Sequence, residues 1–181
     1  MSSPDKIIAE TKHLRFVERD GWSYVERPTA NGVVCIVACT DDNKLVLVEQ
    51  YRPPVDRRVI ELPAGLSGDL SEIAGEPLEA AARRELLEET GYEAGELRRC
   101  VDVASSAGLT NEVVTFFVAA KLQKVASGGG DESEDITVRE IALNELDVWL
   151  TQAHESGKMI DAKVYGGLYL LPRCNKAGSV Q

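Results

Sequence analysis

Three glutamates near the middle of the chain, Glu85, Glu88 and Glu89, have the side chains and the spacing needed to bind a cation. If residues 78–90 form a helix, positions three and four residues apart lie on one side of it. The like charges of Glu85 and Glu89 then repel one another at a cost of a few tenths of a kcal/mol. A hard divalent cation would relieve this repulsion, and Mg²⁺ is the usual choice when a phosphate supplies further oxygen ligands. The alternative is a solvated acidic face that the neighbouring arginines neutralise.

The residues on either side of the glutamates extend the pattern into a longer motif. Upstream, Glu61-Leu62-Pro63-Ala64-Gly65 predicts an apolar strand that ends in a Pro/Gly turn. Seven residues then separate Glu76 from the run Arg84-Glu85-Leu86-Leu87-Glu88-Glu89-Thr90-Gly91. The stretch from Glu76 to Gly91 resembles at every position the Nudix box, the signature of hydrolases that cleave nucleoside diphosphates linked to another moiety.

The chain departs from the family pattern at two places. Ten residues lie between Gly65 and Glu76, where the family pattern has five. The extra residues lengthen the loop before the helix, which costs little chain entropy. Tyr92 stands at the closing aliphatic position, a change that leaves the acidic side chains in place. Within the motif, Arg84 at i,i+4 from Glu88 is expected to orient that carboxylate and not to contact substrate.

The resemblance implies a role for each residue of the motif. Glu85 and Glu89 would bind metal together with the main-chain carbonyl of Ala64, and Glu88 would act as a catalytic residue that orients water. Gly65 would border the substrate. The implied cofactor is Mg²⁺, as two or three ions, with Mn²⁺ as a substitute.

A glycine-rich acidic segment follows later in the chain, as Ser127-Gly128-Gly129-Gly130-Asp131-Glu132-Ser133-Glu134-Asp135-Ile136. Three glycines before a run of acids predict a mobile loop, and such a run is usually a solvated surface. In the ADP-ribose pyrophosphatases, which the chain resembles here, a loop at this place supplies the general base. The resemblance implies that Glu132 is the base and that Glu134 is a further metal-linked carboxylate. The run of acids leaves open which of the two is the base.

Two other residues are candidates for substrate binding. Arg52 follows a predicted strand in the sequence Gln50-Tyr51-Arg52-Pro53-Pro54, where the prolines end strand pairing. The resemblance implies that its guanidinium contacts the pyrophosphate, whose geometry it matches. The loop of residues 105–112 resembles the Ser-Pro-Gly loop of the same pyrophosphatases, with alanine at the proline position, and Glu112 would accept a sugar hydroxyl. The alternatives are a surface arginine and a plain connecting loop.

The composition limits the class of protein. With 181 residues and 44% hydrophobic residues, the chain can form one domain with a full core. A formal net charge of −10 argues against binding to nucleic acid or to an anionic membrane. The four cysteines lack metal-binding spacing and are typical of a reducing compartment. Since we find neither a signal peptide nor a long apolar run, we expect a cytoplasmic protein.

The periodicity of apolar residues predicts an α+β fold. Predicted strands cover residues 11–18, 22–26, 33–39, 44–50, 59–62, 97–104, 112–122 and 136–141, and predicted helices cover 78–90, 146–153 and 161–171. Pro77 suits the first position of the helix 78–90, and Gly91 suits the position after its end. The resemblance implies a three-layer α/β/α Nudix sandwich with a mixed sheet, preceded by an N-terminal β-hairpin.

The hairpin is expected to form an arm of its own. Asp20-Gly21 is a strong hairpin turn signal, and we assign residues 1–28 to the arm and residues 29–181 to the Nudix hydrolase domain. The resemblance implies a homodimer that the arm helps to form. For the aromatic residues Phe16, Trp22 and Tyr24, core packing, a dimer contact and base stacking all stay open.

The function implied by the resemblance is Mg²⁺-dependent hydrolysis of the pyrophosphate bond of nucleoside diphosphate sugars. The products would be a nucleoside monophosphate and a sugar phosphate, from ADP-ribose, ADP-glucose or GDP-mannose. One alternative is a Nudix enzyme acting on coenzyme A or dinucleoside polyphosphates. Another is a non-catalytic sensor of nucleotide sugars. A sensor would tolerate loss of Glu85, Glu88 or Glu89, yet all three are present.

Overall fold

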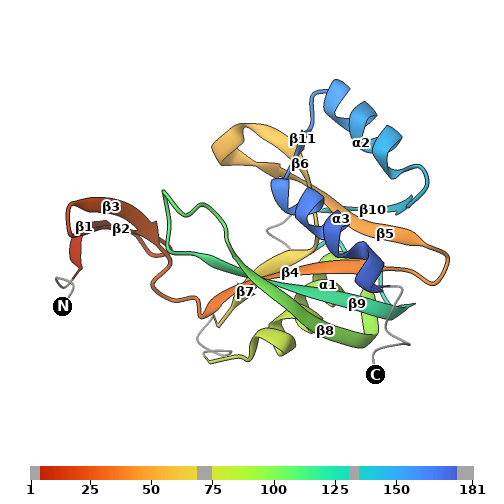
Figure 1. Ribbon diagram of the computed structural model, residues 1–181, viewed down its shortest axis with the longest axis horizontal. Helices are drawn as coiled ribbons and strands as arrows, with labels where there is room; N and C mark the ends of the chain where they lie inside the picture. The colour runs from red at the N-terminus through yellow and green to blue at the C-terminus, as the bar shows by residue number, and fades with distance from the viewer. Residues whose placement is uncertain (1–4, 69–74, 131–134, 175–181) are drawn as a thin grey trace.

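A mixed β-sheet is the centre of the structure, a computed structural model that describes residues 5–68, 75–130 and 135–174 (Figure 1). The eight-stranded sheet has the order β11-β6-β5-β4-β9-β8, with β10 paired to β5 and β7 paired to β4. Strands β4 and β9 are parallel, as are β6 and β11, and the other pairs are antiparallel. The strands are β4 (Gly32–Cys39), β5 (Lys44–Arg52), β6 (Arg57–Glu61), β7 (Ala64–Ser67), β8 (Tyr92–Ala104), β9 (Val113–Lys124), β10 (Thr137–Ala142) and β11 (Met159–Ile160).

Strand β4 lies between two hydrophobic cores. Residues 34–38 are fully buried, as expected for a strand that is apolar at every position. Because successive side chains point to opposite faces, Cys35 and Val37 join one core while Val34 and Ile36 join the other. The predicted strand 33–39 is thus a central strand that is buried on both faces.

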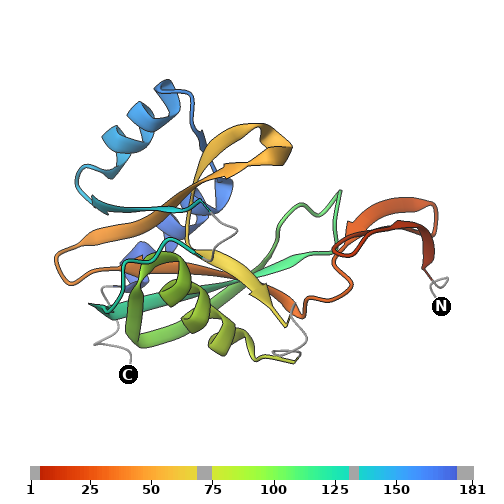
Figure 2. The same ribbon diagram turned by 180° about the vertical axis from the view of Figure 1, so that it is seen from behind.

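Helices cover both faces of the sheet, which gives three layers (Figures 1 and 2). Helix α1 (Leu78–Thr90) packs Ala81, Ala82 and Leu86 onto one face. Helices α2 (Leu146–Glu155) and α3 (Ala162–Cys174) contribute to the core on the other face. The predicted α+β class and layered sandwich are confirmed, and none of the described helices is long and apolar enough to cross a bilayer.

The bounds of α1 agree with the prediction, whereas Pro77 does not take the position expected for it. Pro77 is extended, with φ −62° and ψ 142°, so it precedes the helix as the N-cap residue and does not occupy the first helical position. Gly91 ends the helix at φ +74°, a left-handed conformation that glycine adopts without strain, and its N–H donates to the Leu87 carbonyl at 2.8 Å.

Two strands of the main sheet were not predicted. Residues 64–67, expected to be a turn and loop, form β7, which pairs with the first half of β4 from Gly32↔Ser67 to Cys35↔Ala64. Strand β5 pairs only with the end of β4, so β7 supplies the partner that the other half needs. Strand β11 follows β10, which was expected to be the last strand, and its two residues are too few to show a pattern.

The N-terminal arm is a three-stranded antiparallel sheet, not a two-stranded hairpin. Its strands are β1 (Lys6–Glu10), β2 (Arg15–Arg19) and β3 (Trp22–Glu26). Thr11 begins a turn at which a strand was expected, and its Oγ1 accepts from the Leu14 N–H at 3.0 Å. The predicted turn at Asp20-Gly21 is present, with positive φ at both residues. Figure 1 shows the arm projecting beyond the main sheet.

The three aromatic residues of the arm differ in burial. Tyr24 is 9% exposed and belongs to the core, whereas Phe16 is 41% and Trp22 is 63% exposed. A core role within this chain therefore holds for Tyr24 and not for Trp22. The exposed rings stay available for a partner or a ligand.

A glycine pair in α3 sets how closely this helix approaches the sheet. A β-carbon on Gly167 would lie 2.6 Å from Leu62 Cδ1 and 3.2 Å from Val37 Cγ2, both in the buried core. A β-carbon on Gly166 would meet only Phe116, at an ordinary 3.7 Å. Of this glycine pair, Gly167 and not Gly166 is therefore needed for the close packing of α3 on the sheet.

We predict opposite effects of alanine at these two positions. Gly166→Ala should stabilise the protein by up to about 1 kcal/mol through helix propensity. In Gly167→Ala the same gain should be outweighed by overpacking, which costs about 1–3 kcal/mol. Urea unfolding of both variants measures the difference. Equal stabilisation by the two substitutions would contradict the close packing.

Candidate functional site

A cavity of about 400 Å³ lies where β6, β7 and α1 meet. It brings together six residues that the sequence had marked from four separate stretches. They are Arg52, Ala64, Gly65, Glu85, Glu89 and Glu112. The cavity is therefore the candidate active site.

The close approach of α1 to β7 positions the first two carboxylates. A β-carbon on Gly65 would overlap the Glu85 carboxylate, so only glycine lets this side chain lie against the strand. Glu89 is 3% exposed, and its Oε2 accepts from the Ala64 N–H at 3.1 Å. Gly65 was expected to permit a turn, but it lies within β7 and its function is to accommodate Glu85.

Arg84 connects the acidic side chains of α1. Its guanidinium donates to Glu76 at 3.0 Å, to Glu85 at 2.9 Å and to Glu88 at 3.0 Å, and also to the Leu66 carbonyl. The Glu76 carboxylate is the main cause that raises the pKa of Arg84 above its usual value. This arginine offsets the repulsion among the glutamates and, as predicted, holds Glu88.

Glu88 is placed differently from the other two glutamates of the motif. Its side chain is 52% exposed, and Glu88 is not among the described residues that line the cavity. It lies beside the site on the solvent side of α1, paired with Arg84.

Among the described residues, three cations line the same cavity. Arg52 Nη2 lies 2.8 Å from Glu61 Oε2, and Arg27 Nε lies 2.8 Å from Glu112 Oε2. Lys163, in the first turn of α3, lies 2.7 Å from Asp161. Positive charge thus lies close to the carboxylates of α1, in a protein whose net charge is negative. Such an arrangement can hold a diphosphate and a cation together.

Sequence reasoning missed Arg27, Glu61 and Lys163. Glu61 had a usable signal, because it ends the strand that leads into the motif. Arg27 and Lys163 had none, since the first follows the arm and the second lies on the last helix. Their place in the cavity depends on contacts between elements far apart in the sequence.

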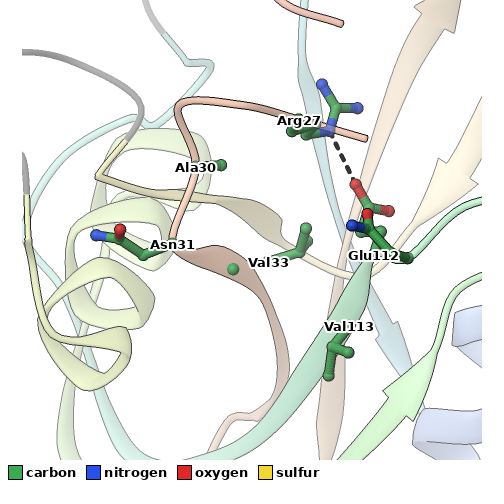
Figure 3. A pocket seen from close by; sticks show the side chains of 8 residues that line it. Arg27, Ala30, Asn31, Val33, Glu112 and Val113 are labelled. Atoms are coloured by element: carbon green, nitrogen blue, oxygen red, sulfur yellow. Dashed lines mark hydrogen bonds and ion pairs between the residues drawn. The ribbon is translucent and has the colours of Figure 1, made fainter. Parts of the chain in front are cut away.

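A second cavity, of about 210 Å³, adjoins the first (Figure 3). Both are lined by Arg27, Val33 and Glu112, and the ion pair between Arg27 and Glu112 lies on the wall of each. The smaller cavity is also lined by Ala30, Asn31, Gly32, Asn111 and Val113. The two cavities together can accept a ligand with two parts.

The glycine segment is packed, in contrast to the mobile loop that was expected. The N–H groups of Gly129 and Gly130 donate to the carbonyls of Glu89 and Glu88, at 2.8 and 3.0 Å. A β-carbon on Gly128 would overlap the backbone of Thr90. The glycines therefore allow this segment to lie against the end of α1. Glu132 and Glu134 lie outside the described residues.

The donor set fits a hard divalent cation. Glu85 and Glu89 present carboxylate oxygens to one cavity, and Mg²⁺ is commonly bound by one or two carboxylates with substrate phosphates. In the described part of the chain, no three His, Cys, Asp or Glu side chains are grouped to hold a metal by themselves. The substrate or residues outside the described part would complete the coordination.

The sequence was compared with known families and proteins. A model of the NUDIX domain matches residues 29–163, most of the chain. The ADP-ribose pyrophosphatase of Bacillus subtilis is 36% identical over 133 residues, which is 73% of this chain and 67% of the relative. The GDP-mannose pyrophosphatase of Citrobacter koseri is 35% identical over 123 residues, with 64% and 61% covered.

A further relative and a solved structure extend the comparison. The methanol dehydrogenase activator of Bacillus methanolicus is 39% identical over 115 residues, or 63% of this chain. The match spans 60% of that relative, less than two thirds of its length. The crystal structure of an ADP compounds hydrolase has the same fold, with a TM-score of 0.63 and 23% identity over 83% of this chain and 82% of that chain.

The domain match, these relatives and the shared fold agree with the motif and with the cavity that it lines. The chain therefore belongs to the NUDIX family.

Proposed function

We propose that this protein hydrolyses the pyrophosphate bond of nucleoside diphosphate sugars to a nucleoside monophosphate and a sugar phosphate. The observation that carries this proposal is the cavity in which Glu85 and Glu89 lie with Arg52. Relatives named ADP-ribose pyrophosphatase and GDP-mannose pyrophosphatase support the substrate class. ADP-ribose, ADP-glucose and GDP-mannose are the candidate substrates.

The carboxylates of α1 would hold the cofactor. Glu85 and Glu89, with the Ala64 carbonyl and Glu134, would bind two or three Mg²⁺ ions, for which Mn²⁺ can substitute. When bound, the cations would neutralise the diphosphate, whose charge otherwise repels an incoming water oxygen. The hydrogen bond from the Ala64 N–H to Glu89 Oε2 keeps the two residues together, which supports a shared role in binding metal.

The other residues would bind the substrate and move the proton. Arg52 keeps donors available for the diphosphate, because its side chain is 44% exposed while Glu61 orients it. Glu112, at both cavities, would accept a hydroxyl of the sugar, and Gly65 would border the diphosphate. Glu132 would accept the proton of the attacking water as general base. Glu88, fixed by Arg84, would orient that water.

The first experiment is product analysis with Mg²⁺ and a panel of ADP-ribose, ADP-glucose, GDP-mannose, UDP-glucose, NADH, coenzyme A and a nucleoside triphosphate. We expect a nucleoside monophosphate from one or a few nucleotide sugars. Glu89→Gln should lower this turnover by about 100-fold or more with the fold intact, since loss of an outer-shell partner alone costs about 10–100-fold.

Two results would count against the assignment. Unchanged activity of Glu89→Gln would refute the role of the motif. If the wild-type protein hydrolyses none of the compounds in the panel, while one of them still raises its melting temperature, a sensor of nucleotide sugars would be favoured.

A pair of variants tests the general base. We expect Glu132→Gln to lower kcat by about 10²–10⁴-fold, the usual contribution of general base catalysis, with metal binding largely preserved. Glu134→Gln is the matched comparison, because it removes the same charge from the same segment. If Glu134→Gln lowers kcat more than Glu132→Gln does, the base is Glu134.

We further propose a cytoplasmic homodimer in which the arm contacts the second subunit. Exposed apolar side chains on the arm support this contact, namely Ile7, Ile8, Leu14, Phe16 and Trp22. Cys35 is a buried free cysteine, which supports a reducing compartment.

Light scattering after size exclusion tests the dimer. We expect a mass of twice the 19.7 kDa of the chain, and a shift toward monomer in the variant Phe16→Ser/Trp22→Ser. Tyr169→Ser, at a residue of α3 that is 78% exposed, is the matched control and should not change the mass. A monomeric wild-type protein, or a dimer that survives the double substitution, would contradict this assembly.

A further inference from the structure

One ion pair joins the N-terminal arm to the candidate site. Arg27 follows β3 in the linker to β4, and Glu112 comes directly before β9. Figure 3 shows their side chains pointing toward one another, with Arg27 Nε donating to Glu112 Oε2 at 2.8 Å. Both residues line both cavities. Two segments that are 85 residues apart in the sequence therefore meet at the boundary between the cavities.

The main chain at Glu112 is fixed by the tip of the β8–β9 hairpin, residues 105–112. The Glu112 N–H donates to Thr110 Oγ1 at 3.1 Å, and its carbonyl accepts from the Ser105 N–H at 3.2 Å. A glutamate side chain still has several rotatable bonds when its main chain is held, and it loses that freedom only when the carboxylate is bound. Arg27 supplies this contact.

The position of Arg27 is set by the pairing of the arm with the same tip. The Val25 N–H donates to the Leu109 carbonyl at 2.8 Å, and Val25 forms a parallel bridge with Thr110. Arg27 stands two residues after Val25, and Glu112 stands two residues after Thr110. The parallel alignment therefore brings the two charged side chains together.

The ion pair is better suited to orienting a carboxylate than to stabilising the fold. The side chains of Arg27 and Glu112 are 40% and 22% exposed, and ion pairs in contact with solvent contribute little to stability. An ionised carboxylate can accept about four hydrogen bonds. One bond from Arg27 thus fixes the direction of the Glu112 carboxylate and leaves it able to accept from the hydroxyl groups of a ligand.

We propose that Arg27 is a positioning residue, which holds the Glu112 carboxylate toward a hydroxyl of the substrate's sugar and so makes the arm part of sugar recognition. This inference rests on the proposed function, in which Glu112 accepts that hydroxyl. Arg27 acts through Glu112 and does not itself contact substrate.

Binding is measured by isothermal titration calorimetry in EDTA, where a Mg²⁺-dependent reaction does not run. The ligands are ADP-ribose, ADP-glucose and GDP-mannose, compared with ADP and GDP, which lack the second sugar. Arg27→Gln should weaken binding of the preferred nucleotide sugar by about 10-fold, the size of a hydrogen bond to a charged group, and leave binding of ADP and GDP unchanged. Arg27→Lys should be intermediate, because it keeps the charge without the planar guanidinium.

Turnover with Mg²⁺ gives a second measurement. KM of Arg27→Gln should rise by about 10-fold with kcat nearly unchanged, as expected when binding common to the ground state and the transition state is lost. The double variant Arg27→Gln/Glu112→Gln should be no worse than Glu112→Gln, since Arg27 acts through Glu112. Arg19→Gln is the matched control, because this arginine of the arm pairs with Asp5, and it should change neither affinity nor KM.

Four results would overturn the proposal. Unchanged affinity of Arg27→Gln would show that Glu112 needs no such partner, and tighter binding would show that the ion pair obstructs the sugar. An equal loss for ADP and GDP would mean that Arg27 holds the nucleotide and not the sugar end. Losses that multiply in the double variant would mean that Arg27 contacts substrate directly.

Failure of the proposed function gives a different result. If the wild-type protein hydrolyses nothing in the panel but binds a nucleotide sugar more tightly than ADP or GDP, the assigned reaction is wrong, and the binding series decides the role of Arg27. If it binds no nucleotide sugar more tightly than ADP or GDP, this inference is wrong whether or not hydrolysis occurs.

Discussion

The packing of α1 against β7 is the contact on which the rest of the site depends. Glu85 lies against a glycine, and Glu89 accepts from the N–H of Ala64 in the same strand. These contacts require β7 to be held in the sheet, and β4 holds it by four residue pairs. A change that moved β7 away from β4 would therefore separate the two carboxylates from the cavity, although neither lies in the sheet.

Electrostatics constrain the same region. Several carboxylates line one cavity in a protein that already has a net charge of −10. Arg84 takes up part of this charge on α1, and Arg52 and Arg27 each pair with a carboxylate on the cavity wall. The site is thus close to balance in charge, so a ligand that brings both a cation and a diphosphate changes the balance little. This is a physical reason for such a ligand to be favoured over a bare anion.

Local features of the sequence predicted the elements that carry the motif. Helix α1 was predicted with the right bounds because Pro77 and Gly91 limit it, and β4 was predicted because every residue in it is apolar. Strand β7 was missed because Pro63 and Gly65 are typical of turns, while its strand conformation comes from pairing with β4. In β7, pairing with β4 therefore outweighed the local propensity of these residues to form a turn.

The candidate site also contains residues that the sequence could predict and residues whose place depends on tertiary structure. Its motif residues could be found from spacing, because a helix fixes their relative positions within a few residues. Arg27 and Lys163 could not, since their positions depend on how the arm and the last helix meet the sheet. The packing of the glycine segment was also missed, because glycine composition alone does not distinguish a flexible segment from one in close backbone contact.

The β8 and β9 hairpin is closed at its base, where the N–H groups of Val125 and Ala126 donate to the Gly91 carbonyl. A β-carbon on Gly91 would overlap Ala126, so this end admits no insertion and no larger residue. The tip, residues 105–112, carries Glu112 to the cavities and meets the arm through Val25. The tip can therefore change its length without moving the end of α1, because the base of the hairpin holds that end in place.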